Sequence, residues 1–76
     1  MVEFTNIKIR DGYIYADAYD VSKSVKRSVK VSCTEEDYYI EGSFKDNCQI
    51  IKAFWSLQRR LNKNKKLNSE ETICWG

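Results

Sequence analysis

The side chains best suited to recognition recur at every second position on both sides of residues 11–12. Lys8 and Arg10 precede that dipeptide, and Tyr13 and Tyr15 follow it. Alternate residues of a β-strand share one face, so these four side chains are expected to lie together. Aromatic rings stack on bases or apolar surfaces, and cations meet phosphate or carboxylate groups. The pattern therefore indicates a candidate binding surface.

Catalytic and metal-binding patterns are absent from the sequence. There is no histidine, no glycine-rich phosphate loop, no nucleophile elbow and no HExxH. Cys33, Cys48 and Cys74 lie far apart, so a zinc site would need a carboxylate or a second chain as a further ligand. We expect no enzymatic activity, no metal and no cofactor, and we interpret the thiols as structural.

Length and composition predict one domain, residues 1–76, with a real hydrophobic core. Hydrophobic residues make up 42% of the 76 residues, and aromatic residues 13%. No apolar run is long enough to span a bilayer, and the first ten residues lack the apolar core of a signal peptide. We therefore expect a cytoplasmic protein without a membrane segment.

The two strands of the first predicted hairpin are residues 4–10 and 13–19. Asp11-Gly12 between two alternating runs is typical of a type I′ turn, which needs positive φ at both central residues. The expected register pairs Arg10 with Tyr13, Ile9 with Ile14, Lys8 with Tyr15, Ile7 with Ala16, Asn6 with Asp17 and Phe4 with Tyr19.

A second hairpin is predicted from residues 25–33 and 38–44. Placing Cys33 opposite Tyr38 sets Val31 against Ile40 and Lys30 against Glu41. Two residues interrupt the pattern. Arg27 breaks the apolar row and indicates a bulge or a strand edge, and Gly42 indicates a bulge or the close approach of another element.

Helical spacing follows from residue 46. Asp46 and Gln49 resemble a capping box, and apolar residues recur on one broad side of the helix: Ile50, Ile51, Ala53, Phe54, Trp55, Leu57 and Leu61. Residues 62–68 are expected to end the helix, with cations where its dipole favours them. Ile73 and Trp75 alternate in the tail and indicate a short final strand.

These elements predict an α+β fold: an antiparallel sheet of about four strands in two hairpins, one amphipathic helix on one face, and a short C-terminal fifth strand. A single helix covers only one face of such a sheet, so the tyrosine-bearing face should stay uncovered. The residues expected on it are Phe4, Lys8, Arg10, Tyr13, Tyr15, Tyr19, Lys30 and Tyr39.

Three interpretations of this face are open. It could contact a protein, including a second copy in a homodimer, through Lys8, Arg10, Tyr13, Tyr15, Tyr19 and Tyr39. It could bind single-stranded nucleic acid, although Asp17 and Glu41 would repel phosphate. It could also be an ordinary exposed face, because tyrosine favours strands.

The net charge is only +2, but cations concentrate on the predicted helix. Lys52, Arg59, Arg60 and Lys63 form a basic side that could contact nucleic acid. Such a run is more often a solvated helix face.

The hairpin "IKIRDGYIYADAY" and the helix "DNCQIIKAFWSLQRRL" resemble, in plan and size, the small accessory proteins of phages and mobile elements, including some anti-CRISPR proteins. The resemblance implies binding to a larger host protein and inhibition of it. Anti-CRISPR proteins that mimic DNA are strongly acidic, so the net charge of +2 favours steric occlusion over mimicry.

Overall fold

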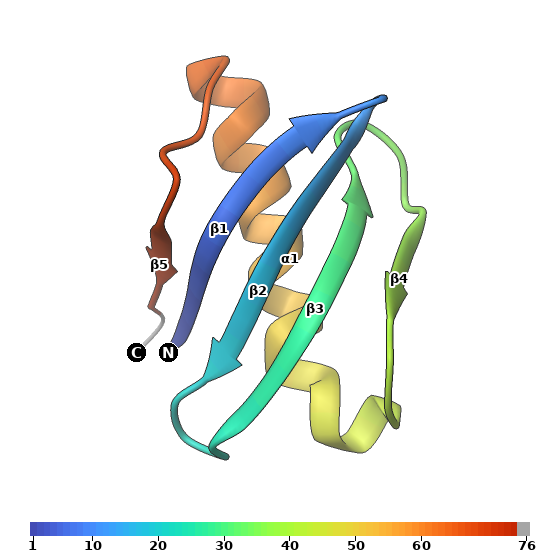
Figure 1. The fold of residues 1–76 in the computed structure, drawn as a ribbon, viewed down its shortest axis with the longest axis vertical. Helices are drawn as coiled ribbons and strands as arrows, with labels where there is room; N and C mark the ends of the chain where they lie inside the picture. Colours follow the sequence, from blue (N-terminus) through green and yellow to red (C-terminus); the bar gives the residue numbers. More distant parts are fainter. Residues whose placement is uncertain (75–76) are drawn as a thin grey trace.

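The computed structural model describes residues 1–74; Trp75, expected in the last strand, lies outside them. The fold is α+β, with one helix packed on a five-stranded antiparallel sheet of order β4-β3-β2-β1-β5 (Figure 1). The elements are β1 (Val2–Arg10), β2 (Tyr13–Asp20), β3 (Val25–Ser32), β4 (Tyr38–Ile40), α1 (Phe44–Asn64) and β5 (Glu71–Ile73). The predicted fold class is confirmed.

The first hairpin turns at the predicted dipeptide. Asp11 and Gly12 have φ values of 54° and 79°, as a type I′ turn requires. Near the turn the expected register is correct, including the pairing of Lys8 with Tyr15. The turn therefore determines which side chains of β1 and β2 share a face close to it.

Further from the turn, the predicted register is wrong because β1 contains a bulge. The register shifts by one residue between Thr5 and Lys8, where Asn6 adopts a φ of 53°. Thr5, not Asn6, consequently lies opposite Asp17, and Phe4 pairs with Ala18. The shift turns Phe4 into the core, where it is fully buried, so Phe4 does not belong to the uncovered face.

The second hairpin differs from its prediction by two residues. Val31 pairs with Tyr38 and Lys30 with Tyr39, so Lys30 does not face Glu41. A shift of two keeps every side chain on its predicted face. β4 ends at Ile40, well before the predicted residue 44.

Of the two interpretations of Gly42, close approach is the correct one. Its φ is +104°, and a Cβ there would meet the Arg27 side chain and the Asn47 amide nitrogen at 3.1 Å. The Arg27 Nε donates to the Asn47 Oδ1 over 3.1 Å. β3 pairs with β2 without a bulge at Arg27. Strand β4 does not extend as far as Arg27, so at this residue β3 forms the edge of the sheet.

The helix begins earlier than the predicted capping box. Ser43 is the N-cap, and its hydroxyl accepts from the Asp46 N–H over 3.2 Å. Asp46 is thus the third helical residue, where a carboxylate favours the helix dipole. At the other end, Lys65 adopts a left-handed φ of 66° and its N–H donates to the Leu61 carbonyl.

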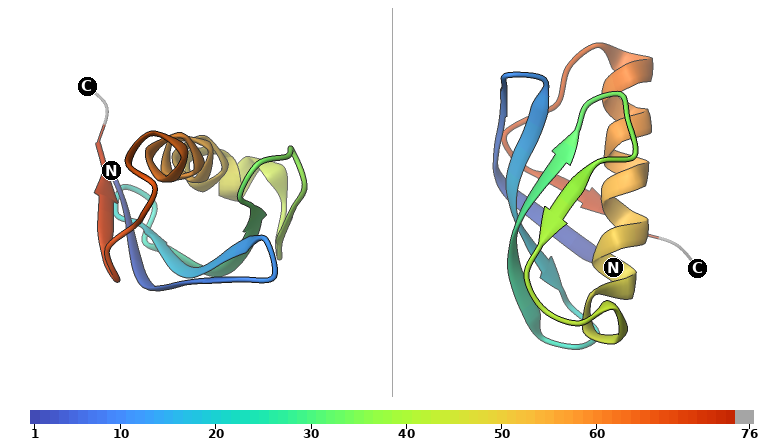
Figure 2. Two further views of the ribbon diagram at one scale, coloured as in Figure 1. Left: turned by 90° about the horizontal axis from the view of Figure 1, so that it is seen from above. Right: turned by 90° about the vertical axis from the view of Figure 1, so that its right-hand side faces the viewer.

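The helix covers one face of the sheet, as both views of Figure 2 show, and the core residues come from these two layers. Ala16 and Ala18 are the small residues of β2 on this face. They leave space for the larger side chains of the helix. The buried apolar residues are Val2, Phe4, Ile14, Ala16, Ala18, Val29, Val31, Ile50, Ala53, Phe54, Leu57 and Ile73. No helix in residues 1–74 is both long and apolar enough to cross a membrane.

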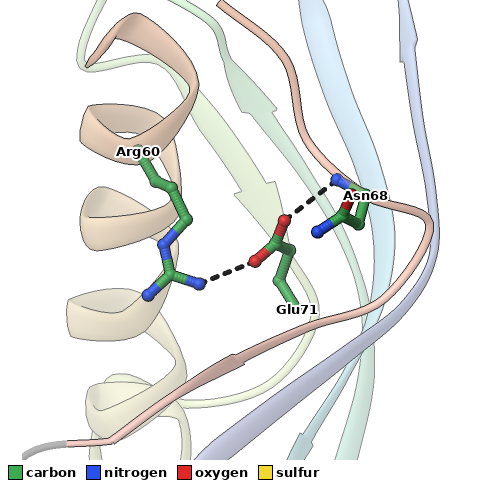
Figure 3. A network of polar contacts seen from close by, with 3 residues as sticks. All are labelled: Arg60, Asn68 and Glu71. Atoms are coloured by element: carbon green, nitrogen blue, oxygen red, sulfur yellow. Dashed lines mark hydrogen bonds and ion pairs between the residues drawn. The ribbon is translucent and has the colours of Figure 1, made fainter. Parts of the chain in front are cut away.

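A charged contact joins the C-terminal strand to the helix. Arg60 donates to the Glu71 carboxylate over 2.7 Å, and the Asn68 N–H donates to the other carboxylate oxygen over 2.9 Å (Figure 3). The Glu71 side chain is only 9% exposed. β5 pairs with Val2–Phe4 of β1, so the predicted fifth strand forms at the β1 edge.

Candidate functional site

The face of the sheet opposite the helix carries a row of alternating cations and aromatic rings. Lys8 lies beside Tyr15, Tyr15 beside Lys30, and Lys30 beside Tyr39, each on a neighbouring strand. Tyr39 is 66% exposed, and Tyr15 is half-buried. The row runs across four strands from β1 to β4. It therefore brings together residues from two separately predicted hairpins.

Cations lie over the tyrosine rings of this face. The Arg10 guanidinium is 5.0 Å from the Tyr15 ring centroid, and the Lys30 Nζ is 4.3 Å from that of Tyr13 and 5.7 Å from that of Tyr15. Each contact lies within the range of cation–π attraction. We call these six residues the sheet platform: Lys8, Arg10, Tyr13, Tyr15, Lys30 and Tyr39.

Tyr13 connects the sheet platform to the loop before β4. Its hydroxyl donates to the Asp37 carboxylate over 2.5 Å. The hydrogen bond, the negative charge of Asp37 and some desolvation all raise the pKa of Tyr13 above its usual 10.0. The contact holds Tyr13 protonated and fixes the loop against β2.

Tyr19 lies apart from the platform, although it was predicted with it. Asp17 separates Tyr19 from Tyr15 along β2, and the Asp17 carboxylate accepts from Asn6 over 2.8 Å and from Ser28 over 3.3 Å. Lys26 lies over the Tyr19 ring, 5.5 Å from its centroid. The part of the face around Tyr19 is an open depression. It is lined by Glu3, Thr5, Asp17, Ala18, Tyr19, Lys26, Arg27 and Ser28.

The basic residues predicted on the helix do not join the platform. Figure 2 shows α1 on the other side of the sheet, and Lys52, Arg59 and Lys63 are exposed there. The fourth, Arg60, is paired with Glu71. One ligand lying on the platform would therefore not reach the helix cations, so these residues form two separate surfaces.

Sequence reasoning missed two partners of the tyrosines. Lys26 pairs with Tyr19 across β2 and β3, and Asp37 bonds Tyr13. Alternation of β2 and β3 places Lys26 on the same face as Tyr19, but it does not by itself select the register that pairs them. No local pattern indicates the Asp37 contact, which depends on the path of a loop.

Comparisons of the chain with protein-family models, curated proteins and solved structures find no match. Within residues 1–74, no group of three or more His, Cys, Asp or Glu side chains is placed to hold a metal ion. The arrangement of the sheet platform is thus the main observation on which a functional proposal can rest.

Proposed function

We propose that this chain is a small, non-enzymatic protein-binding module that docks a partner on the sheet platform. Tyrosine and arginine are the residue types that most often anchor protein interfaces. Here Tyr39 presents its ring to solvent, Tyr15 is half-buried with Arg10 over its ring, and Arg10 and Lys8 supply oriented charge. The observation that supports the proposal is the unbroken cation–aromatic row across four strands.

A partner seated on this platform would have its own surface blocked by a compact body measuring 30 × 23 × 19 Å. We propose steric occlusion of a larger host protein as the mode of inhibition. This mode needs no catalytic group and no strong net charge, and the chain carries only +2. It would suit an anti-defence protein of a phage or mobile element acting in the cytoplasm.

Affinity capture from a lysate of the native host tests the proposal. The bait variants are Lys8→Glu and Tyr15→Ala, and Lys52→Glu on the helix is the control with the same charge change as Lys8→Glu. We expect a host protein that the wild-type chain and Lys52→Glu retain equally. Both platform variants should bind it at least about tenfold more weakly, as expected for interface anchors. Equal capture by all four proteins would contradict the proposal.

A second function, single-stranded nucleic-acid binding, is favoured by Lys8, Arg10 and Lys30 around two tyrosine rings. Two observations oppose it. The ring faces of Tyr13 and Tyr15 are already covered by cations, and Asp37 lies at the Tyr13 hydroxyl. Fluorescence anisotropy with mixed-sequence oligonucleotides decides the question. Binding through phosphates must weaken linearly on a log–log plot against salt concentration.

A further inference from the structure

The outer edge of β4 has unpaired backbone groups at two residues. The Ser32 N–H donates to the Asp37 carbonyl over 2.7 Å. Hydrogen-bonded pairs alternate along an antiparallel ladder, so the next such pair is Lys30 with Tyr39. Tyr38 and Ile40 therefore direct their N–H and C=O groups away from β3. No hydrogen bond joins these groups to another residue in the part of the chain that the structure describes.

β4 carries exposed aromatic side chains on both of its faces, and a further one begins the helix. Tyr39, on the platform side, is 66% exposed. On the helix side, Tyr38 is 41% exposed and contacts Trp55 edge-on, with ring centroids 5.7 Å apart. Phe44, at the start of the helix, is 71% exposed. A strand added beside β4 would find apolar surface at its helix-facing positions.

The row on the platform side ends with an aromatic ring. From β1 to β4 it runs Lys8, Tyr15, Lys30 and Tyr39, so cation and ring alternate up to the edge. A residue on an added strand would lie directly beside Tyr39, at the spacing of one further strand. A lysine or arginine there would continue the alternation and contact the exposed ring of Tyr39.

Acidic residues lie at both ends of β4. Glu35, Glu36 and Asp37 precede the strand and Glu41 follows it, and all four are exposed. A basic segment is attracted to this edge and an acidic one is repelled. Two copies of the chain pairing through β4 would bring both acidic groups together. The symmetric register centred on Tyr39 would set Asp37 opposite Glu41 of the other copy.

We propose that the β4 edge binds an extended, basic strand of a partner protein. Its backbone pairs with the outward groups of Tyr38 and Ile40. Its cations lie beside Tyr39, and its apolar residues pack toward Tyr38 and Phe44. The edge shares Tyr39 with the sheet platform, but the backbone groups of Tyr38 and Ile40, which the added strand would pair with, lie outside the platform. The inference can therefore hold if platform docking fails, and the reverse is also true.

Amide hydrogen exchange on the full chain tests the inference, with a short capped peptide of alternating lysine and valine as the probe. The peptide should slow exchange at the amides of Tyr38 and Ile40. At a free peptide concentration of ten times the measured Kd, the slowing should be about elevenfold. The amide of Tyr39 already pairs with Lys30, so its exchange should change less.

Two control peptides separate edge pairing from other binding. A peptide with glutamate in place of lysine lacks the charge complement. A peptide N-methylated at its valines, which lie opposite Tyr38 and Ile40 in the proposed pairing, cannot donate to the edge. We expect neither to protect Tyr38 or Ile40. Protection by either control equal to that by the lysine peptide would overturn the proposal. So would binding of the lysine peptide without protection at these two amides, or no binding at all.

Matched charge variants complete the test. Glu41→Lys should weaken binding of the lysine peptide several-fold, whereas Glu70→Lys, exposed near the opposite edge, should leave it unchanged. Equal effects of the two variants would contradict the charge argument. If the amides of Tyr38 and Ile40 are protected in the free protein and lose protection on dilution, a second copy occupies the edge. That result would also overturn the proposal.

Discussion

Lys30 lies over the ring of Tyr13, with its Nζ atom 4.3 Å from the ring centroid, while the hydroxyl of the same tyrosine donates to Asp37. One tyrosine thus joins a cation of β3 to a carboxylate of the loop before β4. The contact arranges part of the sheet platform in the free protein. A partner would meet ordered side chains and would lose less conformational entropy on docking.

Asp37→Asn should lower the pKa of Tyr13 toward its usual 10.0. In the wild-type protein the pKa is raised by the hydrogen bond and the charge of Asp37. A raised folded-state pKa gives stability that is fully present below about pH 10 and is lost as the pH rises through the folded-state pKa. Tyrosinate absorbance in alkaline titrations of both proteins measures the difference. A Tyr13 pKa equal in the two would contradict the contact.

Acid should weaken the attachment of β5. Burial alone raises the pKa of Glu71, but the Asn68 N–H and the Arg60 guanidinium outweigh it, and the pKa lies below its usual 4.5. The stability from this lowered pKa is present above about pH 4.5 and is lost as the pH falls through the folded-state value. Glu71→Gln should lower the free energy of unfolding at pH 7 by about 1 kcal/mol. The loss is modest because Arg60 is partly exposed, and solvent screens the ion pair. Urea unfolding at pH 7 and pH 3 should show a smaller pH effect in this variant.

Gly42→Ala should destabilise the protein more than Gly12→Ala. Both glycines have positive φ, but a Cβ at Gly42 would lie 3.1 Å from Arg27 and Asn47, whereas one at Gly12 would lie in open space. At Gly12 the strained φ should lower the free energy of unfolding by about 1 kcal/mol. At Gly42 the crowding should increase the loss to about 2–3 kcal/mol. Chemical denaturation measures both, and equal losses would contradict the crowding.

Phe4→Ala and Tyr19→Ala test the bulge in β1. Phe4 is fully buried, so Phe4→Ala should lower the free energy of unfolding by about 3–5 kcal/mol. Tyr19 is half-buried on the uncovered face, so Tyr19→Ala should lower it by less than half as much. A continuous register would place Phe4 opposite Tyr19 on that face. If Phe4→Ala proves the milder change by thermal unfolding, the bulge is wrong.

The elements, and the side of the sheet or helix on which most side chains lie, were predictable because they depend on local sequence patterns. Asp11-Gly12 determines a turn, and alternation around it determines which side of the sheet Tyr13 and Tyr15 occupy. The apolar period after residue 46 likewise determines which side of the helix is buried, with Phe54 at its centre. These predictions are confirmed because propensity and pattern agree there.

The parts not predicted depend on contacts between distant residues. Asn6 can adopt positive φ, but nothing nearby shows that it does so, and the resulting bulge moved Phe4 from the surface to the core. The start of the helix is an exception: Ser43 and Asp46 form a local capping pattern, which the prediction passed over because it continued the strand to residue 44. In the platform, the row from Lys8 to Tyr39 requires Lys30 to pair with Tyr39. Alternation could not select this pairing, because a shift of two residues between β3 and β4 leaves every side chain on the same face.

Photo-crosslinking gives the most direct test that the uncovered face is the docking surface. A benzophenone amino acid replaces Lys8 on the platform in one bait and Lys52 on the outer side of the helix in another; both lysines are exposed, and Lys8 lies three strands away from the β4 edge. After irradiation in host lysate, the substituted position 8 should crosslink one defined protein, and position 52 should not. Crosslinks to that protein from position 52 alone would place the docking surface on the helix and contradict the account.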